Sequence, residues 1–310
     1  MNKLFLLFVL AILPNAPINA QTKNSKTYNV CTSDLTNFVR IYSSVDSVNR
    51  INVYQTEYLD KGSVGLKDYA SLRFDNAGGL VERIYGSSKK SIFYQNLCTT
   101  IQRTDFEAMK KSFRTSIDGL KNLYPQAVVP DVYLLVGGLG NGSTPGKTGL
   151  LIGIDSYLLC FDDRSVIQDL DATVAHELVH FNQSYLAHDS LIEHNLLAQV
   201  IKEGSADFIG ELISGRVEHC NLKMYEYGEA HCKELWKDFQ KDLAQNTNID
   251  RWLYNDQPDR PASLGYFMGY KITKAYYNKA KNKKQAIKEI LTIPPSGFES
   301  FLQKSGYDGE

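Results

Sequence analysis

The sequence predicts an α+β protein that is mainly helical and contains a small sheet. Stretches in which apolar residues recur every three or four positions, and which end at caps, glycines or prolines, predict the helices. Two short, continuous apolar runs at residues 132–136 and 149–154 predict buried strands. The formal net charge of −1 gives no indication that the protein binds nucleic acid.

Residues 1–20 have the features of a secretory signal peptide. Lys3 supplies the positive start, residues 4–13 are apolar, and Ala20 ends a small-residue cleavage site. The apolar stretch is too short to span a bilayer, and no later segment is long and apolar enough to do so. We therefore expect an exported protein, periplasmic or secreted, with no transmembrane segment in the mature chain. Residues 21–310 are expected to form one domain, in which a helical part, residues 21–103, packs on residues 104–310.

The helices are predicted in chain order from their periodicity and their ends. Residues 34–94 contain helical stretches broken by turn signals, and a clearer helix covers 104–123, where Thr104 and Glu107 form a capping box. After the two strands, a helix covers residues 171–185. Further helices are expected over 196–213 before Gly215, over 264–279 with Ser263 as cap, over 284–291 and over 298–304.

The cysteines are odd in number, which leaves at least one thiol unpaired in an oxidising compartment. Cys160 lies in an apolar run and is interpreted as a buried free thiol. That interpretation leaves Cys220 with Cys232, and Cys31 with Cys98, as the predicted disulfides.

The most informative feature is the string His176-Glu177-Leu178-Val179-His180. Two histidines four residues apart lie on one side of a helix, one turn apart, where both imidazoles can reach one metal ion. Glu177 lies on the flank, where it can act on a water molecule without binding the metal. This is the HExxH pattern of zinc metalloproteases.

A catalytic zinc site needs a third protein ligand, and Glu203 is the best candidate, with Glu193 and Glu211 as rivals. Glu203 would lie on the second arm of a helical hairpin. That arm begins either after Asn195 or at a cap on Ser190, and the sequence leaves both open.

Two neighbours of Glu203 support this assignment. Asp207 lies one turn later on the same face, where it could accept the outer ring N–H of a ligand histidine. Gly204 lies on the apolar side of the same helix, which predicts that another helix approaches closely there.

These features resemble the gluzincin metallopeptidases, which carry HExxH on one helix, a glutamate ligand on the next and an acidic residue four positions after it. More closely, the chain resembles the bacterial family of predicted zinc-dependent proteases related to the gliding-motility lipoproteins. The stretches that carry this resemblance are residues 58–63, 176–181, 203–208 and 264–270. The chain lacks the lipid-attachment cysteine of the lipoprotein branch.

The resemblance implies a zincin-like fold and a zinc-dependent peptidase that acts on a peptide or protein substrate. Zinc would lower the pKa of its bound water to near 7 and polarise the scissile carbonyl, with Glu177 as general base and then acid. Tyr266 or Tyr270 would stabilise the oxyanion. The strand at 149–154 could serve as an edge to which an extended substrate adds. The alternative is a non-catalytic, metal-binding protein of the cell envelope that keeps the fold.

Overall fold

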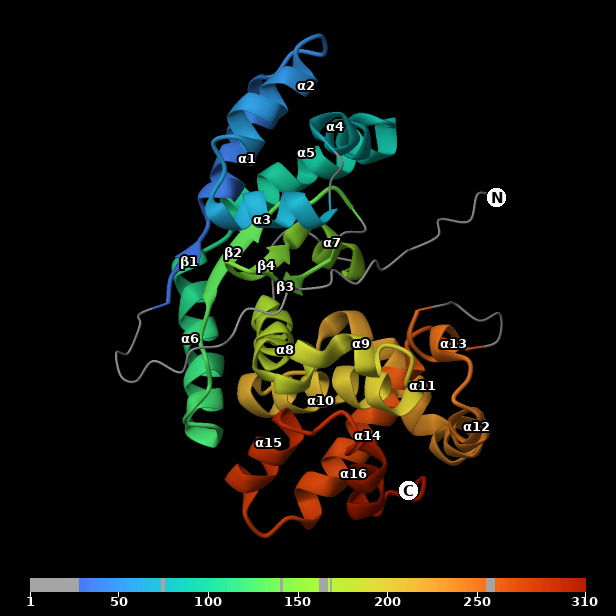
Figure 1. Ribbon diagram of the computed structural model, residues 1–310. Coiled ribbons are helices and arrows are strands. Elements are labelled where there is room, and N and C mark those ends of the chain that lie inside the picture. Colours follow the sequence, from blue (N-terminus) through green and yellow to red (C-terminus); the bar gives the residue numbers. More distant parts are fainter. Residues whose placement is uncertain (1–27, 74–75, 140–141, 162–166, 168, 255–259) are drawn as a thin grey trace. The chain divides into compact units, whose positions relative to one another are not determined.

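The computed structural model describes residues 28–310, except 74–75, 140–141, 162–166, 168 and 255–259. Helices make up most of the described chain, and four short strands form one mixed sheet (Figure 1). This confirms the predicted α+β class with a small sheet. The predicted signal peptide, residues 1–20, lies outside the described residues.

The described chain divides into two compact units. The sheet unit contains residues 28–114 and Val129–Phe181, and the helical unit contains Thr115–Val128 and Asn182–Glu310. Two of the three boundaries fall inside helices α6 (Phe106–Leu123) and α8 (Leu170–Asn182), and the third lies after α6, between residues 128 and 129. The expected packing of residues 21–103 on residues 104–310 in one domain stays a prediction.

The sheet has the strand order β1 (Val30–Cys31), β2 (Asp131–Leu135), β4 (Gly149–Gly153), β3 (Thr144–Pro145). The β1–β2 and β2–β4 pairs are parallel, and β3 runs antiparallel to β4. Strands β2 and β4 are almost wholly buried, as their continuous apolar runs predicted.

The prediction that residues 149–154 form a free edge strand is wrong. β4 lies inside the sheet, between β2 and β3. The chain turns back between β3 and β4 through a hydrogen bond from Gly146 N to Gly149 O at 2.7 Å, so that β3 pairs with β4 on the side opposite β2. At Leu150 and Leu151 the backbone of β4 is already paired on both sides, so it cannot accept a further strand there.

The sheet unit has further helical segments, of which α1 and α3 contact the sheet directly. Their bounds are α1 (Ser33–Ser44), α2 (Arg50–Val53), the π-helix η1 (Tyr54–Leu59), α3 (Val64–Arg73), α4 (Ala77–Tyr85), α5 (Ser88–Arg103), α7 (Ile154–Tyr157) and the 3-10 turn η2 (Leu158–Cys160). The predicted helical content of residues 34–94 is confirmed.

A buried carboxylate fixes the backbone that follows β2. Asp155 accepts hydrogen bonds from Gly137 N at 2.9 Å, from Leu139 N at 2.9 Å and from the Tyr94 hydroxyl at 2.8 Å. Burial raises the pKa of Asp155, and these three hydrogen bonds oppose the shift. The loop after β2 is therefore held from inside the unit rather than by solvent.

The helical unit is built around the pair α10 (Leu196–Ser214) and α14 (Leu264–Lys279). The other helical segments are η3 (Ser184–His188), α9 (Asp189–Ile192), η4 (His219–Asn221), α11 (Leu222–Ala230), α12 (Cys232–Gln245), α13 (Ile249–Leu253), α15 (Lys283–Leu291) and α16 (Phe298–Ser305). The predicted helices at 196–213, 264–279, 284–291 and 298–304 are confirmed within one residue at each end. Helices α11 to α13 were not predicted.

Glycines allow α10 and α14 to approach closely, as Gly204 predicted. A Cβ atom on Gly204 would lie 2.1 Å from Tyr270 N and 2.2 Å from Gly269 C. On the facing helix, a Cβ atom on Gly269 would lie 1.8 Å from Val200 O. The two backbones are therefore in direct contact.

Two predicted caps are wrong. Asp105, not Thr104, caps α6, because its carboxylate accepts from Glu107 N and Ala108 N, each at 3.0 Å. The Thr104 hydroxyl instead donates to Thr100 O at 2.8 Å, because Thr104 ends the preceding helix α5. Ser263 precedes α14 in a left-handed conformation, and its side chain makes no capping hydrogen bond.

The predicted disulfides are also wrong. Cys160 and Cys220 are disulfide-bonded, whereas Cys31, Cys98 and Cys232 are free thiols. The apolar run around Cys160 suggested an inert buried thiol, but Cys160 ends the short turn η2 and is exposed there. The thiol that is buried and free is Cys98.

None of the helices in the described part of the chain combines the length and apolar character needed to cross a bilayer.

Candidate metal centre

Helix α8 in the sheet unit carries the two histidines of the HExxH string. Their rings lie on successive turns with centroids 4.5 Å apart and planes at 86°. Each histidine is only 7% exposed, because nearly the whole helix is buried. Apolar side chains such as Val174, Leu178 and Val179 enclose its other sides. Two polar rings therefore lie in a mostly apolar environment, where polar groups need partners.

Glu177 lies on the flank of this helix, about 100° around the axis from His176. Its side chain is also buried, with 8% of the residue exposed. The Glu177 carboxylate is therefore buried like the two histidines but lies on a different face of the helix.

Helix α10 in the helical unit carries Glu203. It begins after Asn195, whose side chain accepts from Ala198 N at 2.9 Å, and it ends at the left-handed Gly215. Of the two starts that the sequence left open, the one after Asn195 is therefore correct. The first arm ends at Asn182, earlier than the predicted residue 185, and short helical turns connect the arms.

The residues that follow α8 are tied to α10 beside Glu203. The Gln183 side chain donates to Lys202 O at 2.8 Å and to Ser205 Oγ at 3.0 Å. The hydroxyl groups of Tyr185 and Ser205 lie 3.5 Å apart. Within the helical unit, these bonds hold Gln183 beside the turn of α10 that carries Glu203.

Three of the predicted ligands form one group. The possible ligand atoms of His176, His180 and Glu203 all lie within 4.8 Å of one another, and all three residues are buried. The rival Glu211 instead accepts a hydrogen bond from Tyr270, and Glu193 pairs with His194 at 3.3 Å.

Glu203 has two further neighbours within the helical unit. The Lys202 ammonium lies 3.5 Å from Glu203 Oε1, and both side chains are 10% exposed. Tyr266 also hydrogen-bonds Glu203; burial first, and then the charge of Glu203, raise its pKa well above the usual value. Sequence reasoning missed Lys202.

The two tyrosines predicted to stabilise an oxyanion have different partners. Tyr266 meets Glu203, whereas the Tyr270 hydroxyl donates to Glu211 Oε2 at 2.5 Å and accepts from Lys274 Nζ at 3.2 Å. Burial raises the pKa of Tyr270 most, and the hydrogen bond to Glu211 adds to the shift. Of the two, only Tyr266 is bonded to a residue of the histidine–glutamate group.

Asp207 is held by side chains that sequence reasoning missed. Its Oδ2 accepts from the Tyr225 hydroxyl at 2.7 Å and from Asn221 Nδ2 at 3.2 Å. The possible ligand atoms of Asp207, His176 and Glu218 also lie within 4.8 Å of one another. The sequence signal was the polar spacing of residues 218, 221 and 225, which is typical of one helical face but also of many solvated faces.

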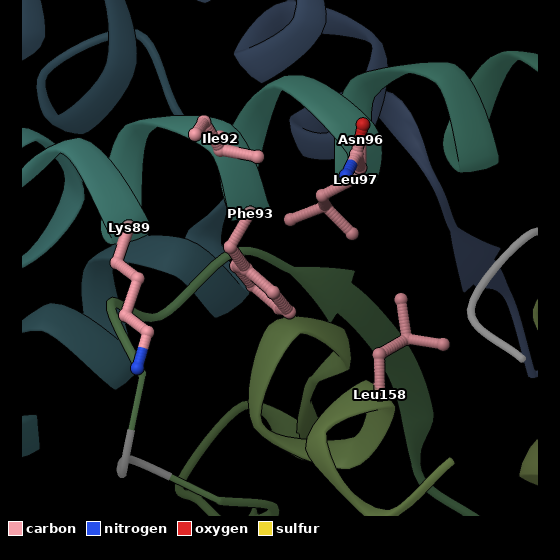
Figure 2. Close-up of a pocket in the computed structure, with 6 residues that line it drawn as sticks. All are labelled: Lys89, Ile92, Phe93, Asn96, Leu97 and Leu158. Carbon is pink, nitrogen blue, oxygen red and sulfur yellow. The ribbon is translucent and has the colours of Figure 1, made fainter. Parts of the chain in front are cut away.

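Figure 2 shows a pocket of about 200 Å³ in the sheet unit. It is lined by Leu158 and by one face of α5, namely Lys89, Ile92, Phe93, Asn96 and Leu97. None of the predicted site residues lines this pocket.

The donor set of the group fits a zinc ion. Two imidazoles and one carboxylate are the ligands that zinc takes in catalytic sites, where a fourth position stays open. All three residues are buried, and their possible ligand atoms lie close enough together for one ion to contact them all.

The comparisons with known proteins point to the same chemistry. A family model described as "Predicted Zn-dependent protease (DUF2268)" matches residues 121–299, more than half of the chain. No curated protein and no solved structure matches the chain significantly.

Proposed function

We propose that this chain, which belongs to the family of predicted Zn-dependent proteases, is an exported, gluzincin-type zinc peptidase. Its substrate would be a peptide or a protein. The observation that carries the proposal is the buried group of His176, His180 and Glu203, whose possible ligand atoms lie within 4.8 Å of one another.

In this proposal His176, His180 and Glu203 bind the metal. A zinc ion held by them would supply a Lewis acid that polarises the scissile carbonyl and makes a water molecule acidic near neutral pH. The Lys202 ammonium, 3.5 Å from Glu203, would pair with the ligand carboxylate when no metal is bound.

Glu177 is the general base. Its carboxylate takes one proton from the attacking water while the water oxygen forms a bond to the carbonyl carbon. The same group then gives that proton to the leaving nitrogen as the C–N bond breaks, so the products are a carboxylic acid and an amine. Burial of Glu177 keeps bulk water away from this transfer.

Tyr266 is the preferred donor to the developing oxyanion. Its raised pKa keeps the hydroxyl protonated, and its bond to Glu203 places it beside the ligand set. Tyr270 is the less favoured candidate, because its hydroxyl is already bonded to Glu211. Asp207 would accept the outer N–H of a ligand histidine and fix the orientation of that ring.

Export, to the periplasm or outside the cell, belongs to the proposal on the basis of the signal-like residues 1–20 alone. Secretion of a reporter fused to this segment, with cleavage after Ala20, is the expected result. Retention of the uncleaved fusion in the cytoplasm would contradict it.

The central test is Glu177→Gln in the full mature chain, with zinc content and peptide hydrolysis measured together. We expect about one zinc per chain in wild type and in this variant, and a loss of about 10²- to 10⁴-fold in the rate of hydrolysis. His180→Ala should lose the zinc. Glu226→Gln, an exposed change on α11, is the matched control and should keep both zinc and activity.

A wild type that binds zinc but hydrolyses no peptide in a diverse library, with Glu177→Gln indistinguishable from it, would support the non-catalytic metal-binding alternative. A wild type without zinc would overturn the proposal.

A further inference from the structure

Asp207 is supported by one short segment of the helical unit, from Glu218 through η4 into α11. Asn221 and Tyr225 of this segment both donate to Asp207 Oδ2, at 3.2 Å and 2.7 Å. Glu218, one turn earlier, belongs to the group whose possible ligand atoms lie within 4.8 Å of one another around Asp207. Asn221 and Tyr225 therefore converge on one carboxylate, and the Glu218 carboxylate lies close to it.

Both donors reach the same oxygen of Asp207. Their bonds restrict rotation of the carboxylate about its terminal torsion, which is otherwise soft. A carboxylate that orients a ligand histidine works only if it is itself held in place, and such outer partners of a metal site influence affinity strongly.

The surroundings of Tyr225 favour donation of a hydrogen bond from its hydroxyl to Asp207. Its ring packs against Phe267 and Tyr270, with centroids 6.0 Å and 5.1 Å away. Burial first, and then the charge of Asp207 and the hydrogen bond to it, raise the pKa of Tyr225 well above its usual value. This shift favours the protonated hydroxyl, which donates to Asp207 Oδ2.

We propose that Tyr225 is a positioning residue of the zinc site, and that its hydroxyl fixes the Asp207 carboxylate so that Asp207 can hold a ligand histidine in its binding orientation. The inference rests on the proposed function. It assigns to α11, which was not predicted from the sequence, a role in setting metal affinity.

The test removes the hydroxyl and keeps the ring. Tyr225→Phe retains the packing against Phe267 and Tyr270, so zinc affinity, measured by competition with a chromophoric chelator, reports on the hydrogen bond. We expect a weakening of about tenfold, the effect of losing one hydrogen bond to a charged group. Tyr227→Phe makes the same chemical change two residues further along α11, where the ring stacks on His231, and should leave affinity unchanged.

A double-mutant cycle shows whether the effect acts through Asp207. In an Asp207→Ala background, Tyr225→Phe should cause no further loss of affinity. Asn221→Ala removes the other donor to Oδ2 and serves as a second variant if Tyr225→Phe folds poorly. It should weaken zinc binding less than Tyr225→Phe, because its bond is longer, and only when Asp207 is present.

Equal zinc affinity in wild type and Tyr225→Phe would overturn the inference and leave the proposed function intact. Additive losses in the double mutant would also overturn it, because Tyr225 would then act by another route. Absence of zinc from the wild type would overturn the proposed function, and this inference with it.

Discussion

Replacing Gly204 with alanine tests whether the close contact of α10 and α14 is a requirement of this fold. The added Cβ would lie 2.1 Å from Tyr270 N and 2.4 Å from Gly269 Cα, whereas ordinary contact begins at 3.4 Å. The three nearest atoms all belong to the backbone of α14, so no side-chain rotation relieves the clash. The helices would have to separate by roughly 1 Å, which forfeits a quarter to a half of the dispersion energy along the contact.

The magnitude follows from two opposing effects. Overpacking against backbone costs about 3 kcal/mol, at the upper end of the usual range. The higher helix propensity of alanine offsets about 1 kcal/mol of this. We expect the free energy of unfolding to fall by about 2 kcal/mol, which lowers the thermal midpoint by about 4 °C for a chain of this size.

The matched control is Gly79→Ala, because Gly79 is also helical but has no atom within 4 Å of the position of a new Cβ. This change should stabilise the protein by about 0.5 kcal/mol, since only the propensity effect operates there. Urea and thermal unfolding of both variants measure the difference. If Gly204→Ala proved as stable as wild type, the deduction that the backbones touch would be refuted.

Three other predictions concern pH, the disulfide and the metal. Burial raises the pKa of Asp155, so the folded chain binds the carboxyl proton of Asp155 more tightly than the unfolded chain does. The contribution of Asp155 to the free energy of unfolding should therefore fall as pH rises from about 4 through the folded pKa, and urea unfolding of wild type and Asp155→Asn across that range measures this fall. In the loop-entropy model, a reductant should lower the free energy of unfolding of wild type by about 4 kcal/mol, whereas a Cys160→Ala/Cys220→Ala variant should be unchanged. Thermal unfolding measures both, and a wild type that is insensitive to reductant would contradict the disulfide. Zinc added at about 100 times its dissociation constant should stabilise the metal-free protein by about 2.7 kcal/mol in calorimetry, and an equal gain in His180→Ala would show that the ion binds elsewhere.

Local sequence patterns predicted the parts of this protein whose formation depends on neighbouring residues. Strands β2 and β4 followed from continuous apolar runs, and the bounds of α10 and α14 followed from periodicity and from stop signals such as Gly215. The histidine spacing placed both rings on one side of α8, because helical geometry alone fixes that relation. Glu203 was predicted as the third ligand because its distance along the chain fitted a helical hairpin, and its possible ligand atoms lie within 4.8 Å of those of both histidines.

The errors arose where the structure depends on which distant segments meet. Cys160 could pair with any cysteine that the fold brought near, and proximity in sequence favoured Cys232 for Cys220 wrongly. β4 looked like an edge because the two residues of β3 are too short to register as a strand. Thr104 and Asp105 are both good caps, and only the position at which α5 ends decides between them.

The support of the candidate site belongs to the same class of long-range features. Asn221 and Tyr225 reach Asp207 only because α11 packs on α14, and α14 in turn contacts α10 through Gly204 and Gly269. In the sequence a tyrosine on a half-exposed helix carries no mark of such a role, since most tyrosines serve packing. Candidate ligands of a metal site can therefore be predicted from spacing, because a shared metal ion would require that spacing. Residues that would position those ligands cannot be predicted in this way, because they can come from any helix that the packing brings within reach. Such residues would link the stability of the fold to metal affinity. A change that separates α10 from α14, such as Gly204→Ala, should therefore also loosen Asp207 and weaken zinc binding.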